Sequence, residues 1–363
     1  MMAGAGDIRV AHLVPAPFDP DDGIIGGAER YSFELARHMA DHVPTELISF
    51  GPRERSATVG NLRVRVLRAH YVRGQRTNPV AAGLWSALGD ATIVHCHQQH
   101  VLASSVAAIC TRLRRRRVFV TDLGGGGLDV STYLSTDSWY HGHLHISEYS
   151  RRVFGHEGNP RARVILGGVD TALFSPERAD GEAVLFVGRL LPHKGVHDLI
   201  DALPPRVPLR IIGRAMDAEY LNLLRAHAAG KCVTFLHDVD DAGLVAEYRR
   251  AACLVLPSVY TTPDGRTTLV PELLGQTLLE AMACGRPAIC TDVASMPEVV
   301  VNGDTGYVVP PGNPAALGAA IAGVLGDPAA ADRMGERGRV RAVEHFSWSR
   351  VVERCLAAYR ANA

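Results

Sequence analysis

The sequence lacks the cysteine pattern of a disulfide-stabilised protein. Its 363 residues include seven cysteines, an odd number, and none of them forms a Cys-x-x-Cys pair. Several, such as Cys253 and Cys290, lie in apolar segments. These features favour a reducing compartment, and we expect the protein to be cytoplasmic.

Long hydrophobic runs and an excess of charge are also missing. No stretch reaches the about 18 apolar residues that a membrane-spanning helix needs. The first residues do not combine a basic segment with a long apolar run, so we expect no signal peptide. Lys and Arg together number 38, as do Asp and Glu, which gives a formal net charge of zero. This balance argues against nucleic acid as a partner.

Three common catalytic and binding motifs are absent. There is no G-x-S-x-G motif of a serine hydrolase and no G-x-x-x-x-G-K-[ST] phosphate loop. No strong G-x-G-x-x-G fingerprint follows the first predicted strand.

What the sequence does contain is a repeated alternation of short apolar strands and amphipathic helices. Helical patterns span Arg30–Ala40, His197–Ala202 and Asp241–Ala251. Alternation of this kind predicts an α/β fold with parallel sheets. The strands that we expect are Ile8–Val14, Thr45–Phe50, Arg63–Leu67, Ile93–His95, Val118–Thr121, His143–Ser147, Arg163–Ile165, Ala183–Val187, Leu209–Ile212, Val233–Leu236, Leu254–Leu256 and Pro287–Thr291.

The alternation restarts in the middle of the chain. One strand series ends near Ile165, and a second opens with Ala183–Val187. At roughly 150 residues per domain, the length also predicts two domains. We therefore expect domains at residues 1–175 and 176–345. Open α/β sheets bind ligands at the carboxyl ends of their strands, so two of them would face each other across a cleft.

The loop after the predicted strand Ala183–Val187 carries two cations. Arg189 and Lys194 stand five residues apart in GRLLPHKG. Arg grips phosphate oxygens with two parallel hydrogen bonds, and Lys acts as a point charge, so together they could hold a diphosphate. The alternative is an ordinary solvated loop with surface charges.

Two carboxylates bracket a predicted helix start in PELLGQTLLEAMACG. We expect Glu272–Gly275 to form a loop and Leu278–Ala283 a helix that Gly285 ends. The amides from Gly275 to Leu278 would then face a ligand. Glu280 could accept both hydroxyl protons of a ribose, but Thr277-x-x-Glu280 also fits a capping box that needs no ligand.

Further candidates lie in the first half of the chain. Gly26 and Gly27 precede a helical pattern, where free amides favour an anion, although a simple turn would look the same. His95 and His97 share one side of a strand, and one of them could bond a substrate. A second alternating run, His141 to His145, reads as a strand edge. Neither run of histidines has a recognisable ligand spacing of a zinc site, and we expect no metal.

Three segments have less specific signals. The run Gly124–Gly127 would let backbone lie against a ligand, or it is a flexible loop. The arginines of Arg112–Arg117 form one cationic cluster, either a solvated helix end or a contact for anionic lipid. The Asp-x-Asp triplets at Asp19 and Asp238 could hold a divalent ion, although Asp240 or Asp241 can equally cap the next helix.

Together these loops resemble the retaining glycosyltransferases of family 4, which have the GT-B fold of two Rossmann-like α/β/α domains. The most specific motif is Glu272-x7-Glu280, which resembles the E-x7-E signature of that family. The resemblance runs through nearly the whole chain. Supporting segments are residues 26–40 (GGAERYSFELARHMA), 94–97 (VHCH), 145–152 (HISEYSRR), 167–174 (GGVDTALF), 187–203 (VGRLLPHKGVHDLIDAL), 248–258 (YRRAACLVLPS) and 297–313 (PEVVVNGDTGYVVPPGN).

The resemblance implies a role for each matching residue. Arg189 and Lys194 would hold the donor diphosphate and stabilise the leaving nucleotide. Glu272 would face the transferred sugar, and Glu280 would bind the ribose. The remaining matches are the donor-lining positions Gly275, Gln276, Thr277 and Leu278, the closing loop at Gly26 and Gly27, and His97 near the reaction centre.

The expected activity is therefore transfer of a sugar from a nucleotide-diphosphate sugar, UDP- or GDP-linked, to a hydroxyl acceptor without a metal or other cofactor. The acceptor could be a small molecule, an oligosaccharide or a lipid, with peripheral contact at the inner membrane face through Arg112–Arg117. A final helix, 346–363, would pack back on the first domain. The alternatives are a UDP-sugar 2-epimerase of similar fold and a non-catalytic nucleotide-sugar-binding protein.

The chain departs from the family pattern in two places. Many relatives carry a His soon after the Thr that Thr121 matches, where this chain has Asp122, Leu123 and the run Gly124–Gly127. The segment Tyr260–Val270 also lengthens the connection that leads to Glu272. No acceptor-binding residue is therefore transferred to these segments.

Overall fold

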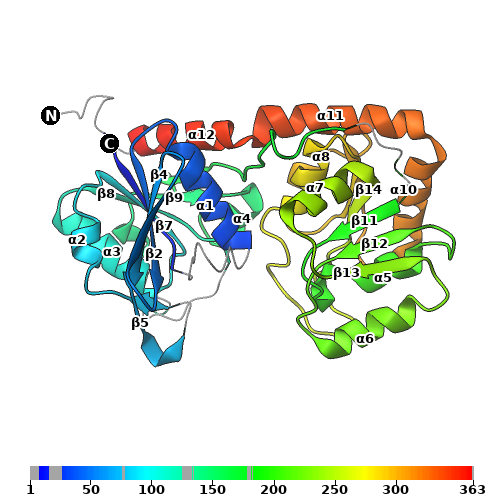
Figure 1. Ribbon diagram of the computed structural model, residues 1–363, viewed down its shortest axis with the longest axis horizontal. Coiled ribbons are helices and arrows are strands. Elements are labelled where there is room, and N and C mark those ends of the chain that lie inside the picture. The colour runs from blue at the N-terminus through cyan, green and yellow to red at the C-terminus, as the bar shows by residue number, and fades with distance from the viewer. Residues whose placement is uncertain are drawn as a thin grey trace. The chain divides into compact units, whose positions relative to one another are not determined.

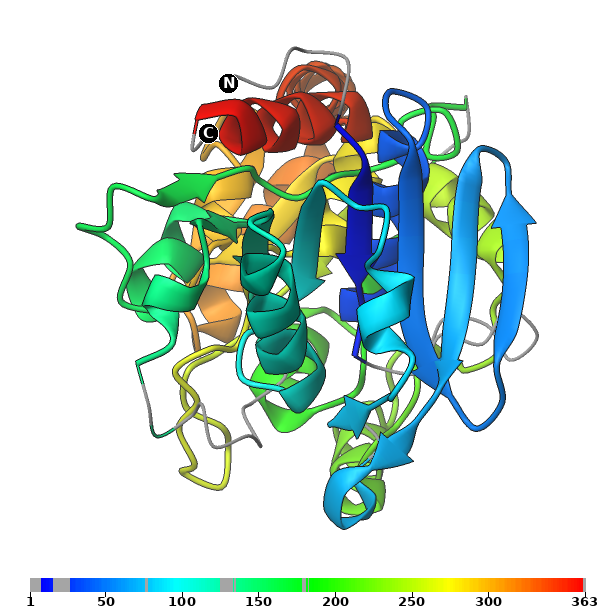
Figure 2. The ribbon, with the colours of Figure 1, turned by 90° about the vertical axis from the view of Figure 1, so that its left-hand side faces the viewer.

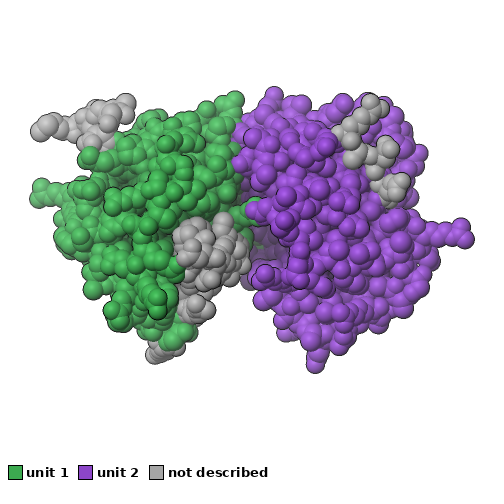
Figure 3. Space-filling model, viewed as in Figure 1, with its two compact units in different colours: residues 1–167, 348–363 green, residues 168–347 purple. Residues whose placement is uncertain are grey.

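The computed structural model describes residues 8–15, 27–75, 78–124, 133, 135–177, 181 and 183–361. The chain divides into two compact units, which Figure 3 shows in different colours. Unit 1 comprises residues 1–167 and 348–363, and unit 2 comprises residues 168–347. The division falls at Gly167, a little before the residue 175 that we expected, and the chain returns to unit 1 at Trp348.

Unit 1 is built on an eight-stranded sheet in the order β10-β9-β8-β7-β1-β2-β4-β3 (Figure 2). Its central strands are parallel, and only β3 pairs in the antiparallel sense, with β4. A separate two-stranded ladder joins β5 and β6. The strands are β1 Val10–Leu13, β2 Thr45–Gly51, β3 Arg55–Val59, β4 Leu62–Arg68, β5 His70–Tyr71, β6 Pro79–Val80, β7 Ile93–His97, β8 Arg117–Thr121, β9 Gly142–His145 and β10 Ala162–Val164.

Helices cover both faces of this sheet. Leu47 and Ile48 are neighbours on β2 and belong to two different apolar cores, because alternate strand residues face opposite sides. α3 packs on one face and α1 on the other (Figure 2), and α12 packs against α1. The helices of unit 1 are α1 Gly27–Met39, α2 Leu84–Ala87, α3 Leu102–Leu113, α4 Glu148–Val153 and α12 Trp348–Ala361.

Unit 2 has a six-stranded parallel sheet in the order β13-β12-β11-β14-β15-β16 (Figure 1). Its strands are β11 Ala183–Val187, β12 Leu209–Ile212, β13 Val233–Leu236, β14 Ala251–Leu256, β15 Ala288–Thr291 and β16 Gly306–Val309. Its helices are α5 Val196–Ala202, α6 Ala218–His227, α7 Asp241–Arg250, α8 Gln276–Ala283, α9 Met296–Val299, α10 Pro314–Gly326 and α11 Pro328–Phe346.

The expected strands all form, and the sequence reading missed several others. β3 has charged and small residues and an exposed face, so it gives no apolar run. β16 is short and only half-buried in its middle. No single described helix has the length and apolar character needed to cross a membrane. α10 and α11 meet that criterion only as a pair, bent by 102° at the break between them.

Candidate active site

The loop that carries Arg189 and Lys194 joins β11 to α5 and is held close to the end of β14. Lys194 ends a short 3-10 helix, Pro192–Lys194, and Gly195 follows in the left-handed region with φ 65°. A Cβ on Gly195 would lie 2.0 Å from the carbonyl oxygen of Pro257, so only glycine fits there. The amide of Val259 donates to the carbonyl of His193 at 2.8 Å. The position of Lys194 is therefore fixed by backbone contacts on both sides.

Lys194 and Glu272 form an ion pair inside unit 2. The Lys194 ammonium donates to Glu272 Oε1, and the two side chains are only 12% and 11% exposed. Ser258 Oγ donates to the same oxygen at 3.1 Å. Arg189 is exposed on the same loop as Lys194 and forms no ion pair with the residues that the structure describes. The loop therefore carries one cation paired with a carboxylate, Lys194, and one exposed cation, Arg189.

α8 begins at Gln276, two residues earlier than expected. Gly275 precedes the helix and lies in the left-handed region, with φ 81°. Because glycine has no side chain, no side chain caps the helix start. The amide of Leu278 already donates to the carbonyl of Gly275 at 3.0 Å. The amides that the helix start leaves for a ligand are those of Gly275, Gln276 and Thr277. The amide of Leu278, which we expected to face a ligand, is therefore already engaged within the helix.

Glu280 is not part of a capping box, because the helix starts before Thr277. Its side chain is instead buried, with 6% exposure, on the face of α8 that packs towards α7. The hydroxyl of the fully buried Tyr248 donates to Glu280 Oε2 at 2.6 Å. A charge-assisted bond of this kind fixes the carboxylate in one orientation. The interpretation of Thr277-x-x-Glu280 as a local cap is wrong.

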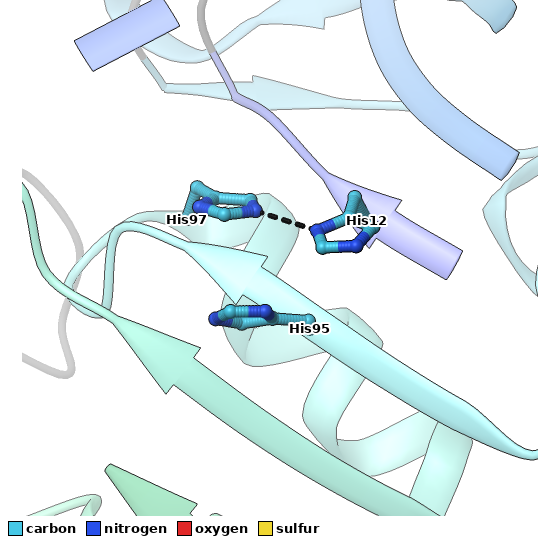
Figure 4. Close-up of side chains that lie close together, drawn as sticks. All are labelled: His12, His95 and His97. Atoms are coloured by element: carbon cyan, nitrogen blue, oxygen red, sulfur yellow. Dashed lines mark hydrogen bonds between the residues drawn. The ribbon is translucent and has the colours of Figure 1, made fainter. Parts of the chain in front are cut away.

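In unit 1, His97 lies in a buried group of three histidines (Figure 4). His97 and His95 come from β7, and His12 comes from the neighbouring strand β1, where it pairs in register with His95. The imidazoles of His95 and His97 stack with their centroids 4.5 Å apart. His12 Nδ1 lies 2.9 Å from His97 Nε2. Strand alternation places all three rings on one side of the sheet, as predicted for His95 and His97.

Burial keeps these imidazoles neutral. Desolvation lowers the pKa of His12 to about 3 and the pKa of His97 well below its usual value. His12 Nε2 lies 3.3 Å from Met39 Sδ, and a thioether sulfur can only accept a hydrogen bond. His12 Nε2 therefore carries the proton, His12 Nδ1 accepts from His97 Nε2, and His97 Nδ1 is left as a bare acceptor. No described residue bonds this nitrogen.

His95 is satisfied within the fold. Its Nε2 lies 2.7 Å from Thr121 Oγ1, and its Nδ1 lies 2.8 Å from the hydroxyl of Tyr359 on α12. Both ring nitrogens are therefore engaged by hydroxyl groups. Of the two histidines on β7, His97 is the one with an atom left for a ligand.

Several other predicted sites are placed only in part. Gly27 is the first residue of α1, whereas Gly26 lies outside the described residues. Gly124 is described and Gly125 to Gly127 are not, nor is the triplet at Asp19. The second triplet has a structural role, because the Asp240 side chain caps α7 by accepting from Gly243 at 2.7 Å.

The arginine cluster after α3 is divided between two kinds of environment. Arg116 donates to the carbonyl of Ala91 at 2.7 Å, and Arg117 donates to the carbonyl of Tyr359. Arg114 stacks over the Trp85 ring at 3.9 Å. Arg112 and Arg115 are exposed. Arg112 also donates to the carbonyl of Trp139 at 3.4 Å, so four of the five side chains have a contact within unit 1.

The segment Tyr260–Val270 forms a small hairpin in unit 2. Thr261 pairs with Thr267, and the amide of Thr268 donates to the carbonyl of Tyr260 at 2.8 Å. The Tyr260 hydroxyl accepts from the amide of Ala294 at 2.8 Å, which ties the start of the hairpin to the loop after β15. The insertion is thus anchored before the chain reaches Glu272.

Sequence reasoning missed Ser258, Tyr248 and His12. Ser258 and Tyr248 stand in the segment YRRAACLVLPS, where apolar neighbours suggest only core and turn. His12 is a single histidine in an apolar strand. Only the strand order, which places β1 next to β7, shows that it meets His97.

Comparisons with known proteins identify the family. The family described as glycosyl transferases group 1 matches residues 173–341. The phosphatidyl-myo-inositol mannosyltransferase of Mycobacterium leprae is 30% identical over 300 residues, which cover 77% of this chain and 76% of the relative. The chain belongs to the group 1 glycosyltransferases.

One relative of this group 1 glycosyltransferase has a higher identity over a smaller part of the chain. The glycogen synthase of Mycobacterium tuberculosis is 35% identical over 221 residues, or 58% of this chain. The match spans only 50% of the glycogen synthase, so the chain covers about half the length of that relative.

Solved structures show the fold. Anabaena HepE in complex with UDP superposes with a TM-score of 0.74 at 20% identity, covering 96% of this chain and 99% of that one. Sucrose-phosphate synthase of Thermosynechococcus elongatus gives a TM-score of 0.73 at 22% identity, covering 97% and 98%. The group 1 glycosyltransferase described here therefore has the expected GT-B fold, with one Rossmann-like sheet in each unit.

Proposed function

We propose that this chain transfers a sugar from a UDP- or GDP-linked donor to a hydroxyl group of an acceptor, with retention of configuration, as a member of glycosyltransferase family 4. Family membership supports sugar transfer, and the HepE complex with UDP supports a nucleotide-linked donor. The Glu272-x7-Glu280 spacing supports the assignment to family 4.

One observation carries the proposal: Lys194, Glu272 and the start of α8 meet in one place in unit 2. The ammonium of Lys194 contacts Glu272, and Gly275, three residues after Glu272, opens the helix. A diphosphate bound here would meet the positive side chains of Lys194 and Arg189 and the amides of the helix start. Glu272, paired with Lys194, would lie beside the sugar that the diphosphate carries.

The same residues provide the chemistry. Breaking the bond between sugar and phosphate develops negative charge on the leaving diphosphate. Fixed cations and helix-end amides stabilise that charge in the transition state, which is the largest single contribution in many enzymes. The transfer needs no divalent ion, because the protein supplies the positive charge. The sugar centre becomes oxocarbenium-like, and the acceptor attacks on the face that the diphosphate leaves.

Two buried groups complete the proposed roles. Glu280, oriented by Tyr248, accepts hydroxyl protons of the nucleotide ribose. His97 offers the bare Nδ1 to a hydroxyl group near the reaction centre. The acceptor is a small molecule, an oligosaccharide or a lipid.

We also propose a cytoplasmic location with contact to the membrane surface. All seven cysteines are described and form no disulfide, which agrees with a reducing compartment. Arg112 and Arg115 are exposed beside Leu113, which is 70% exposed, so this helix end presents both charge and apolar surface. Sedimentation with vesicles of phosphatidylcholine, with and without phosphatidylserine, tests this contact, and binding that ignores the anionic lipid would contradict it.

The donor proposal is tested by a panel of nucleotide sugars. Thermal shift identifies the donor, and chromatography of the products then measures nucleotide release with and without acceptor sugars. We expect nucleotide release and a product with the anomeric configuration of the donor. Conversion of the donor sugar to its epimer without nucleotide release would instead identify an epimerase, and binding with neither change would identify a binding protein.

The lysines offer a second, direct test. The chain has only two, and Lys231 donates to the carbonyl of Ile200 at 2.6 Å, outside the proposed site. Acylation of surface amines followed by mass spectrometry should show that UDP protects Lys194 and leaves Lys231 unchanged. Equal labelling of Lys194 with and without a saturating nucleotide would contradict the proposed donor site.

A further inference from the structure

A second group of titratable side chains lies in unit 1, apart from His12, His95 and His97. Asp137 belongs to a 3-10 turn that precedes β9, His143 lies on β9, and His156 follows α4. One side-chain ligand atom from each of the three lies within 4.8 Å of the other two. His143 and His156 are buried, whereas the Asp137 side chain is 42% exposed.

The separation of the groups is unusual for a hydrogen-bonded pair. Asp137 Oδ2 lies 3.5 Å from His156 Nε2, longer than the roughly 2.7–3.2 Å of a protein N–H···O bond. Two ligands at about 2.0–2.2 Å from one tetrahedral zinc ion lie about 3.3–3.6 Å apart. The distance between Asp137 and His156 therefore matches two ligands of one ion.

The remaining atoms of these side chains are held by neighbours. Gln99 Nε2 donates to the other carboxylate oxygen, Asp137 Oδ1, at 2.8 Å. His156 Nδ1 lies 3.1 Å from His145 Nε2. Metal-binding histidines and carboxylates are characteristically oriented by outer hydrogen bonds of this type. Neither of these two bonds uses Asp137 Oδ2 or His156 Nε2, which lie 3.5 Å apart.

His143 completes the set as a neutral imidazole. Its Nε2 lies 3.3 Å from the carbonyl oxygen of Asp137, which can only accept, so the proton belongs on Nε2 and the lone pair on Nδ1. Its ring centroid is 4.1 Å from that of His156.

We propose that Asp137, His143 and His156 bind one zinc ion in unit 1. Two imidazoles and one carboxylate are a ligand set that zinc takes readily, and they leave one position for water. The exposed side of Asp137 gives the ion a path from solvent. The ion lies outside the proposed donor site in unit 2, and its role is to join the turn before β9 to the segment after α4. This proposal departs from our expectation that the chain binds no metal.

The group of His12, His95 and His97 is a useful contrast. His12 and His97 are 2.9 Å apart and bonded to each other, and both nitrogens of His95 are engaged by hydroxyl groups. Among the ring nitrogens of these three histidines, only His97 Nδ1 has no hydrogen-bond partner among the described residues, and one free nitrogen does not make a metal site. Substituting His12 therefore provides a matched control for the zinc site.

The test is a titration of metal-free, untagged protein with Zn²⁺, and with Co²⁺ as a visible probe. We expect one zinc ion per chain, a tetrahedral Co²⁺ absorption spectrum, and displacement of Co²⁺ by Zn²⁺. Asp137→Asn and His156→Gln keep side-chain size and should each weaken zinc binding at least tenfold, whereas His12→Gln should leave it unchanged. Absence of binding at micromolar zinc, unchanged binding in both site variants, or loss of binding in His12→Gln would overturn the proposal.

X-ray absorption at the zinc edge provides a measurement that does not depend on the folding of variants. The wild-type protein with one equivalent of zinc should show only nitrogen and oxygen ligands, with the scattering pattern of two imidazoles. A sulfur ligand or three imidazoles would assign the ion to other residues and refute the site. Neither experiment involves sugar transfer, so its outcome is independent of the proposed function.

Discussion

The ammonium of Lys194 contacts Oε1 of Glu272, although the two residues lie 78 positions apart in the chain. Both side chains are largely buried, so removing either charge alone leaves the other uncompensated in a poorly solvated place. In the absence of a donor the pair holds both groups in position. Under the proposed function, a diphosphate would add negative charge on the side of Lys194 and Arg189, and the sugar that it carries would meet Glu272.

Removal of the Lys194 charge should reduce turnover strongly. We expect Lys194→Ala to lower kcat by about 100- to 1000-fold, the range for loss of one group that stabilises transition-state charge. Arg337→Ala is the matched control, because it removes one cation from an exposed ion pair with Asp304 in the same unit. Steady-state kinetics with the identified donor checks the prediction. Comparable losses in both variants would mean that unit 2 responds to total charge rather than to Lys194.

The Tyr248 hydroxyl should influence donor binding through Glu280. Tyr248→Phe removes the 2.6 Å bond that orients the buried carboxylate. Hydrogen bonds to charged groups contribute about 1.5–3 kcal/mol, so we expect the donor KM to rise at least tenfold with little change in kcat. Tyr220→Phe, which removes another buried hydroxyl of unit 2, controls for lost packing. The ribose role of Glu280 is refuted if the two variants have the same KM.

Chelation should leave sugar transfer intact. In the proposed mechanism Arg189, Lys194 and the α8 amides supply the positive charge at the leaving group, so brief treatment with EDTA should change the initial rate less than twofold. The proposed zinc ion lies elsewhere, and its removal should lower the melting temperature of unit 1. Initial rates with EDTA and after addition of Mg²⁺ or Mn²⁺ check this. Complete loss of the rate, restored by either ion, would contradict metal-independent transfer.

Stability should fall as the solution becomes acidic. Burial lowers the pKa of His12 to about 3, whereas the unfolded chain titrates near 6.5. Below pH 6.5 the unfolded state therefore binds more protons, and the free energy of unfolding decreases as the pH falls toward 3. Each such histidine contributes about 1.4 kcal/mol per pH unit in that window. His95 and His97 shift in the same direction for the same main reason, burial.

Tryptophan fluorescence isolates this effect in unit 1. All three tryptophans, at positions 85, 139 and 348, belong to that unit. Urea unfolding should give a lower free energy of unfolding at pH 5.5 than at pH 6.5. His12→Gln should make this difference smaller by the contribution of one histidine. An unchanged pH dependence in His12→Gln would show that the imidazole of His12 is protonated in the folded protein.

The strands were predictable from sequence wherever they were continuously apolar. β11, with the sequence AVLFV, has the predicted bounds because every side chain is buried. β3 was not predictable, since an edge strand that pairs only with β4 needs no apolar face. The capping-box pattern Thr277-x-x-Glu280 was misleading, because α8 begins earlier, directly after Gly275. The Glu280 carboxylate accepts a hydrogen bond from the Tyr248 hydroxyl instead.

The site residues that were predicted came from loops with special residue types. Lys194 and Glu272 stand beside glycine and proline in loops, and such positions mark the ends of parallel strands. Their mutual contact was not predictable, because it depends on β14 lying next to β11. The same limit applies to Asp137, His143 and His156. Their spacings of six and thirteen residues follow no familiar zinc motif, and only the turn before β9 brings them together.

Isothermal titration of the wild-type protein and Lys194→Ala with UDP and with GDP, in buffer that contains EDTA, tests the central claim most directly. We expect one of the two nucleotides to bind the wild-type protein with a Kd in the micromolar range, and its affinity to fall at least tenfold in Lys194→Ala. Equal affinity in the two proteins, or binding only when a divalent ion is added, would contradict a donor site built on Lys194 and the start of α8.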